Sequence, residues 1–179
     1  NPTDREIVYS SARGDSFDLY RRPVDLSRPE QLLPDLDNNP RAADWTRQGV
    51  LVVREEIDGK GMDLRTLSDV DDPSTRRPLL EGADDELAPN VSADGRWLAF
   101  VSDYSGADEV YVTGFPEPGG RSQISVQGGN SPLWAPDGRT LFYFEGRTLI
   151  AAAVETEPRF QVTGRRTVIE GNFLTYRWS

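Results

Sequence analysis

Short apolar runs recur along the whole chain, and each is bounded by glycine, proline or aspartate. Four of these runs are rich in β-branched or aromatic residues, at 7–9, 50–53, 97–101 and 141–144. Each is followed by a polar loop and then by a second run in which polar and apolar residues alternate, at 17–20, 62–65, 109–112 and 148–150. Runs of this length, with turn residues between them, predict β-strands. No stretch carries a sustained helical period.

The strands group into four copies of one unit. A short strand ahead of each apolar run ends at Trp45, Val91, Trp134 or Trp178, with separations of 46, 43 and 44 residues. A fourth, edge-like strand is expected at 31–33, 78–80, 123–125 and 167–169. A repeat of about 40–45 residues with four strands is typical of a propeller blade. We therefore predict an all-β fold, a β-propeller of four-stranded antiparallel blades with four repeats in this chain.

The whole chain, 1–179, is expected to form a single propeller domain. Its blades are predicted at about 1–33, 41–82, 87–128 and 131–171. Residues 172–179 resemble a first strand with no blade after it, so we expect them to complete the first blade and to remove free sheet edges. Three arrangements fit such ends: a four-bladed ring, half of a dimeric eight-bladed ring, or a fragment of a larger propeller. Because the chain begins at Asn1 without a leader, we expect a processed product or a piece of a longer chain.

Two of the turns carry a family resemblance. Residues 134–139, Trp-Ala-Pro-Asp-Gly-Arg, and residues 91–96, Val-Ser-Ala-Asp-Gly-Arg, resemble the Pro-Asp-signature blades of TolB-like and WD-repeat-like propellers. These occur in bacterial extracytoplasmic and kinase-associated proteins. In the second repeat, 47–49 depart from this turn. The resemblance implies the propeller fold and a periplasmic or extracellular location. Family members bind protein partners, act as sensors or gate serine peptidases, so the role follows only by analogy.

Composition removes several classes of function. The chain has 20 Lys+Arg and 30 Asp+Glu, a net charge of −10, and it has neither histidine nor cysteine. Histidine-based triads, thiol nucleophiles and the usual zinc sites are therefore excluded. The acidic balance argues against nucleic acid as a partner. The longest apolar run, 149–154, is too short to insert into a membrane. We predict that the protein is not an enzyme.

Acidic residues are expected to gather on one face of the propeller. In a blade of this kind, the loops between the second and third strands share a face with the loops that join consecutive blades. Arg96, Arg121 and Arg139 are expected on the opposite face. An acidic face attracts cationic partners over long range. The candidate binding residues on the acidic face are Asp35, Asp37, Asn38, Asp84, Asp85, Glu86, Asp103 and Asp108.

The aspartate–glycine turns and the tryptophans are expected to be structural. Asp94, Gly95, Asp137 and Gly138 suit tight turns, because a short carboxylate can accept from the backbone just ahead and glycine accepts positive φ. Trp45, Trp134 and Trp178 are expected to pack between blades.

The function we expect is noncatalytic: a scaffold that presents loops to a protein, peptide or glycan partner, without a cofactor. One alternative is a calcium-dependent hydrolase or lyase with its site at the tunnel mouth, because the acidic loops at 35–39 and 84–86 could supply oxygen ligands. Their acids are neighbours in sequence and do not follow an EF-hand pattern, so we assign no metal ligands. A second alternative is a structural or gating module of a larger kinase or peptidase. A homodimer is among the open arrangements.

Overall fold

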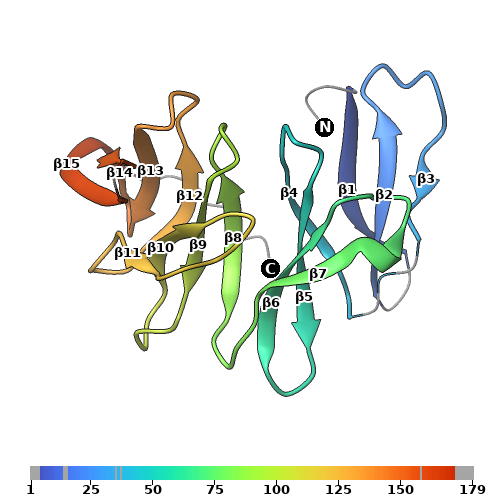
Figure 1. Ribbon diagram of the computed structural model, residues 1–179, viewed down its shortest axis with the longest axis horizontal. Coiled ribbons are helices and arrows are strands. Elements are labelled where there is room, and N and C mark those ends of the chain that lie inside the picture. Colours follow the sequence, from blue (N-terminus) through green and yellow to red (C-terminus); the bar gives the residue numbers. More distant parts are fainter. Residues whose placement is uncertain (1–4, 14–15, 35, 37, 158, 172–179) are drawn as a thin grey trace.

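Four antiparallel sheets follow one another in chain order across the molecule (Figure 1). The computed structural model describes residues 5–13, 16–34, 36, 38–157 and 159–171. The first sheet has three strands and each of the others has four. Within the described residues the only helical segment is a 3-10 turn, η1 (Pro73–Thr75). The all-β architecture predicted from the sequence is confirmed.

Every sheet is built from strands that follow one another along the chain. The first contains β1 (Glu6–Ala12), β2 (Phe17–Pro23) and β3 (Gln31–Leu32). The second contains β4 (Arg41–Trp45), β5 (Leu51–Ile57), β6 (Gly61–Leu67) and β7 (Arg76–Leu80). The third contains β8 (Glu86–Val91), β9 (Trp97–Ser102), β10 (Glu109–Gly114) and β11 (Ser122–Gln123). The fourth contains β12 (Asn130–Trp134), β13 (Thr140–Glu145), β14 (Thr148–Glu155) and β15 (Gln161–Glu170).

The last two strands are longer than predicted. The sequence pattern marked only 148–150 and 167–169, whereas β14 spans eight residues and β15 spans ten. Nearly all of β15 is exposed, so burial imposes no apolar alternation on it. A strand held by backbone hydrogen bonds on a solvated surface leaves little hydrophobic signal in the sequence.

Apolar cores lie between consecutive sheets. One joins the first and second sheets and includes Leu19 and Val53. The next joins the second and third, with Val52 against Phe100. A third joins the third and fourth, with Val112 against Tyr143. Alternating residues of each strand therefore face opposite neighbours, which is how stacked blades bury both sides of a sheet.

A closed ring is not seen among the described residues. Their core clusters join neighbouring sheets in chain order, and none joins the fourth sheet to the first. The segment 172–179, expected to complete the first blade, lies outside the described residues, as does Trp178. Large exposed apolar side chains are concentrated on the first and fourth sheets and their loops, at Ile7, Val24, Leu26, Leu32, Leu133, Val168 and Ile169.

Side-chain hydrogen bonds link the first strands of the second, third and fourth sheets, β4, β8 and β12. Asp44 accepts from the backbone N–H of Val91 at 2.7 Å and from the Asn90 amide at 3.3 Å. Asn90 in turn accepts from the backbone N–H of Trp134 at 2.7 Å. The next residue at this repeat position, Leu133, has no hydrogen-bonding group and is 57% exposed. The links therefore run from the second sheet to the fourth and stop there.

We expect Asp44→Ala to destabilise the fold by about 2 kcal/mol, because the half-buried N–H of Val91 loses its acceptor. Asp44→Asn keeps an acceptor and should cost less than half as much. Urea unfolding followed by tryptophan fluorescence measures both. Equal losses for the two variants would show that the charge matters and not the acceptor.

Candidate functional site

Hydrogen bonds tie the loops that join consecutive sheets to the hairpins between second and third strands. The Asp85 carboxylate accepts from the backbone N–H of Met62 at 2.8 Å, and the Asp85 N–H donates to Asp103 at 2.8 Å. The N–H of Gly128 donates to Glu109 at 2.9 Å. These bonds hold loops 58–60, 81–85, 103–108 and 124–129 together as one surface, called here the joining-loop face.

The structure separates the predicted binding residues into different environments. Asp103 and Asp108 are exposed on the β9–β10 hairpin, and Asp84 and Asp85 are half-buried. Asn38 is exposed with φ of +69°, and its carbonyl accepts from the N–H of Glu56. Asp35 and Asp37 lie outside the described residues. Asp85 and Asp103 use carboxylate oxygens to hold the loops, so part of the acidic cluster has a structural role.

Glu86 differs from the surface residue that the sequence suggested. Its side chain is fully buried and pairs with Arg121 at 3.3 Å. Burial raises the pKa of Glu86 to about 7. The charges of Asp63 and Asp84 raise this pKa further, while Arg121 opposes the shift. An acid that follows two other acids in the sequence is expected to be exposed to solvent. Here β8 begins at Glu86, and the side chain of this first strand residue is buried.

Arg121 was expected on the opposite face, and its contacts correct that placement. Its guanidinium lies 5.1 Å from the ring centroid of Tyr104 and 5.7 Å from that of Phe100. Tyr104 belongs to the β9–β10 hairpin and is 63% exposed. The long side chain thus spans the height of the sheet and reaches the joining-loop face.

An acid that recurs near the start of β2, β6 and β10 was missed by the sequence analysis. Asp63 accepts from the N–H of Gly82 at 3.3 Å, and Glu109 accepts from the N–H of Gly128. Each bond holds the loop that leads to the following sheet. Both acids are almost completely buried. The signal was present, because an acid recurs in this position at Asp18, Asp63 and Glu109.

The aspartate–glycine turns have the contacts of structural turns. Asp94 accepts from the N–H of Arg96 at 3.1 Å, and Asp137 accepts from the N–H of Arg139 at 2.9 Å. Their following glycines have φ of +71° and +66°, a region that favours glycine. Neither carboxylate is directed at the joining-loop face.

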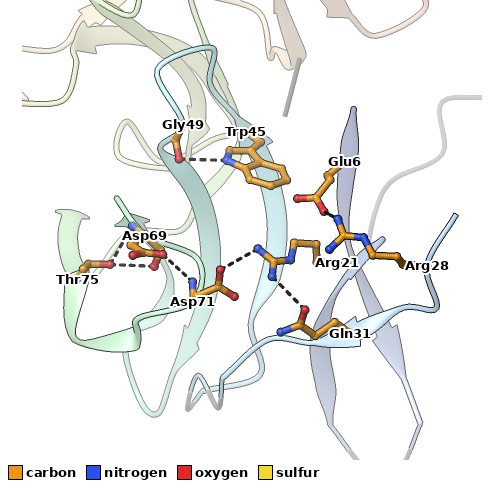
Figure 2. Close-up of polar contacts among 9 residues, drawn as sticks. All are labelled: Glu6, Arg21, Arg28, Gln31, Trp45, Gly49, Asp69, Asp71 and Thr75. Atoms are coloured by element: carbon orange, nitrogen blue, oxygen red, sulfur yellow. Dashed lines mark hydrogen bonds and ion pairs between the residues drawn. The ribbon is translucent and has the colours of Figure 1, made fainter. Parts of the chain in front are cut away.

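Two of the three tryptophans expected between blades lie there in the structure. Trp134 is buried in the core between the third and fourth sheets. Trp45 packs against the core between the first and second, and its indole N–H donates to the Gly49 carbonyl at 3.1 Å (Figure 2). These rings therefore stabilise the stack and are not free to bind a ligand.

A pocket of about 350 Å³ lies on the rim of the first sheet, between β2 and the loop before β3. Its charged groups are paired: Glu30 with Arg13 at 2.6 Å, and the others as Figure 2 shows. Arg21 donates to Asp71 at 2.9 Å and to Gln31 at 3.0 Å, while Arg28 donates to Glu6 at 2.9 Å. The pocket thus offers little net charge, and we do not place the site there.

The described residues hold no group of three or more acids arranged to bind a metal ion. The calcium alternative therefore has no support from this part of the chain, and no catalytic constellation is assigned.

The fold resembles known propellers, although no family model and no curated protein matches the sequence. TolB from Agrobacterium tumefaciens superposes with a TM-score of 0.71 at 15% identity, over 93% of this chain and 63% of that one. TolB from Acinetobacter baumannii gives 0.69 at 17% identity, over 96% and 42%. A prolyl endopeptidase structure gives 0.64 at 10% identity, over 93% and 26%.

The chain thus spans less than two thirds of the length of either TolB structure. No helix among the described residues has the length and apolar character needed to cross a bilayer. At these identities the similarity establishes the fold and not the function. The chain has the fold of TolB-like β-propeller blades.

Proposed function

We propose that this protein is a noncatalytic recognition module whose joining-loop face binds a cationic segment of a protein or peptide partner. The observation that carries the proposal is the mutual tethering of acidic loops on one face, through Asp85, Met62 and Asp103. Loops fixed to a rigid scaffold lose little entropy on binding. The charge of −10 steers cationic partners towards such a surface.

Similarity to TolB supports a binding role, and by the same analogy we propose a periplasmic or extracellular location. The sequence has no histidine or cysteine to serve as a base or a nucleophile. A glycan is a weaker candidate partner, because the acidic face suits cations better than neutral hydroxyls.

A second candidate is a structural or gating module within a larger protein. It is favoured by the similarity to a prolyl endopeptidase and by the apolar side chains exposed on the first and fourth sheets. Light scattering over a range of concentrations separates the arrangements. A dimer would support two copies that cover each other's outer sheets, whereas a monomer near 20.0 kDa would not.

The binding proposal is tested with an acetylated, amidated peptide of alternating lysine and glycine. The joint variant Asp58→Asn, Asp84→Asn, Asp108→Asn should weaken binding by about tenfold at low salt and flatten its salt dependence. The matched control, Glu117→Gln, Glu155→Gln, Glu157→Gln, removes the same charge at the other ends of the strands. If both variants lose affinity equally, net charge alone is responsible and the joining-loop face is not a site.

A further inference from the structure

Tyr104 and Val126 stand out among the exposed apolar side chains. They are 63% and 64% exposed, and they are the large exposed apolar residues of the described chain that lie outside the first and fourth sheets and their loops. Both belong to the joining-loop face. Elsewhere the second and third sheets bury their large apolar groups, so this exposure is specific to the face that carries the acidic loops.

The Tyr104 ring is held in place although it is exposed. The Arg121 guanidinium lies 5.1 Å from its centroid, and the Tyr111 ring meets it edge-on with centroids 6.3 Å apart. An aromatic ring that is already ordered loses little further freedom when a partner binds. Tyrosine and arginine in such positions are the residues most often found at the centre of protein interfaces.

Beneath Tyr104, the polar network is incomplete. Arg121 pairs with one oxygen of Glu86, while the other oxygen, Oε2, is buried without a hydrogen-bond partner among the described residues. The Tyr111 hydroxyl is likewise buried and unpartnered in this part of the chain. Both oxygens therefore have lone pairs available to accept a hydrogen bond from a donor that binds beside Tyr104.

The charges around this cluster are mainly negative. Asp84 lies close enough to Glu86 to raise its pKa, and Asp103 and Asp108 flank Tyr104 on the same hairpin. No three of these acids converge as metal ligands. A spread of carboxylates beside an exposed ring suits an extended organic cation, which can lie on the aromatic face while its N–H groups reach several acids.

We propose that Tyr104 is the central contact for an arginine-bearing segment of the partner, with the Glu86–Arg121 pair as the floor of the site. The inference rests on the proposed function and names the position on the joining-loop face where the cation binds. The guanidinium would lie against the Tyr104 ring, and the acids of loops 81–85 and 103–108 would face its N–H groups.

A linked change in protonation is expected. The groups that face Glu86 are Asp63, Asp84 and Arg121, and together with burial they leave its pKa at about 7. An added cation favours the ionised carboxylate, so binding at neutral pH should release a proton from Glu86. Affinity should therefore increase as the pH rises from about 6 to 8.

Calorimetric titration with acetyl-Gly-Arg-Gly-Arg-Gly-amide, in two buffers of different ionisation enthalpy, measures affinity and proton release together. We expect Tyr104→Ala to weaken binding by about tenfold and Tyr104→Phe to keep it within about twofold. Leu26→Ala, which truncates a side chain 60% exposed on a loop of the first sheet, is the matched control and should change nothing. Glu86→Gln should abolish the proton release.

The outcomes separate this inference from the proposed function. If Tyr104→Ala binds normally while the Asp58, Asp84 and Asp108 variant does not, the acidic face binds cations but Tyr104 is not its centre. If the unaltered protein binds the lysine peptide but not the arginine peptide, the arginine site is wrong and the acidic face still binds cations; if it binds neither better than a glutamine counterpart, both proposals are wrong. Proton release that persists in Glu86→Gln would overturn the role of Glu86 alone.

Discussion

Gly61→Ala should be among the most destabilising single substitutions in this chain, with a loss of about 3 kcal/mol. Gly61 has φ of +106°, a conformation that residues with a Cβ rarely adopt. A Cβ there would also lie 2.3 Å from an oxygen of Asp85, the carboxylate that holds the second sheet to the joining loop. The substitution therefore combines backbone strain with displacement of the Asp85 tether. Chemical denaturation with tryptophan fluorescence measures the loss.

The same hairpin supplies the control. Gly59 has φ of +73°, but no atom lies within 4 Å of the position that its Cβ would occupy. Gly59→Ala should therefore cost only the conformational strain, about 1 kcal/mol. Combining Gly61→Ala with Asp85→Ala removes the collision. The double variant should therefore lose less stability than the sum of the losses of the two single variants. Strict additivity, or equal costs at Gly59 and Gly61, would show that the Asp85 contact is not what requires glycine.

This hairpin also connects stability to the proposed binding. Asp85 is tied to Met62 on one side and to Asp103 on the other, so it fixes the positions of two loops of the joining-loop face. Neutralising Asp85 would both remove a charge and release the loops. For that reason the binding tests use Asp58, Asp84 and Asp108, whose side chains make no hydrogen bond or ion pair with another residue that the structure describes.

Local chemistry explains what the sequence could predict. The turn at Asp94 and Gly95 is encoded within a few residues, because the carboxylate bonds the N–H of Arg96 and glycine takes the positive φ. A strand such as β9 was equally easy to predict, since burial between two neighbouring sheets makes residues 97–101 continuously apolar. The 43-residue recurrence of that turn then indicated repeated blades.

Features that depend on distant partners could not be predicted in the same way. Glu86 is adjacent to Asp84 and Asp85, and only its pairing with Arg121, 35 residues away, shows that it is buried. Arg121 was assigned by its position in a loop, although a long side chain can reach well beyond its Cα. The candidate site at Tyr104 depends on both of these residues, so it became visible only with the structure.

Glu86 should make the protein less stable as the pH rises through the neutral range. In the unfolded chain this carboxyl ionises near its ordinary pKa of 4.5, whereas in the folded state it keeps its proton up to about 7. Between these values the folded state binds the extra proton, so the free energy of unfolding falls with increasing pH. The decrease reaches about 3 kcal/mol once both states are ionised, with solvent relaxation making this an upper value.

Glu86→Gln isolates this contribution, because glutamine has nearly the same shape and does not titrate. We expect the variant to be more stable than the unaltered protein at pH 8 and to show a flatter profile between pH 4.5 and pH 7. Acids whose pKa is lowered in the fold, such as Asp94, have the opposite effect: the fold loses stability as the pH falls and they become protonated. These acids are present in both proteins, so their effect cancels in the comparison. The difference between the two urea-unfolding profiles therefore reports on Glu86. A difference that is constant with pH would mean that Glu86 has the same pKa in the folded and unfolded states, with Arg121 offsetting the effect of burial. If Glu86 proves both to lower stability at neutral pH and to be needed for the proposed cation binding, that combination is the pattern expected of a binding site and not of a structural ion pair.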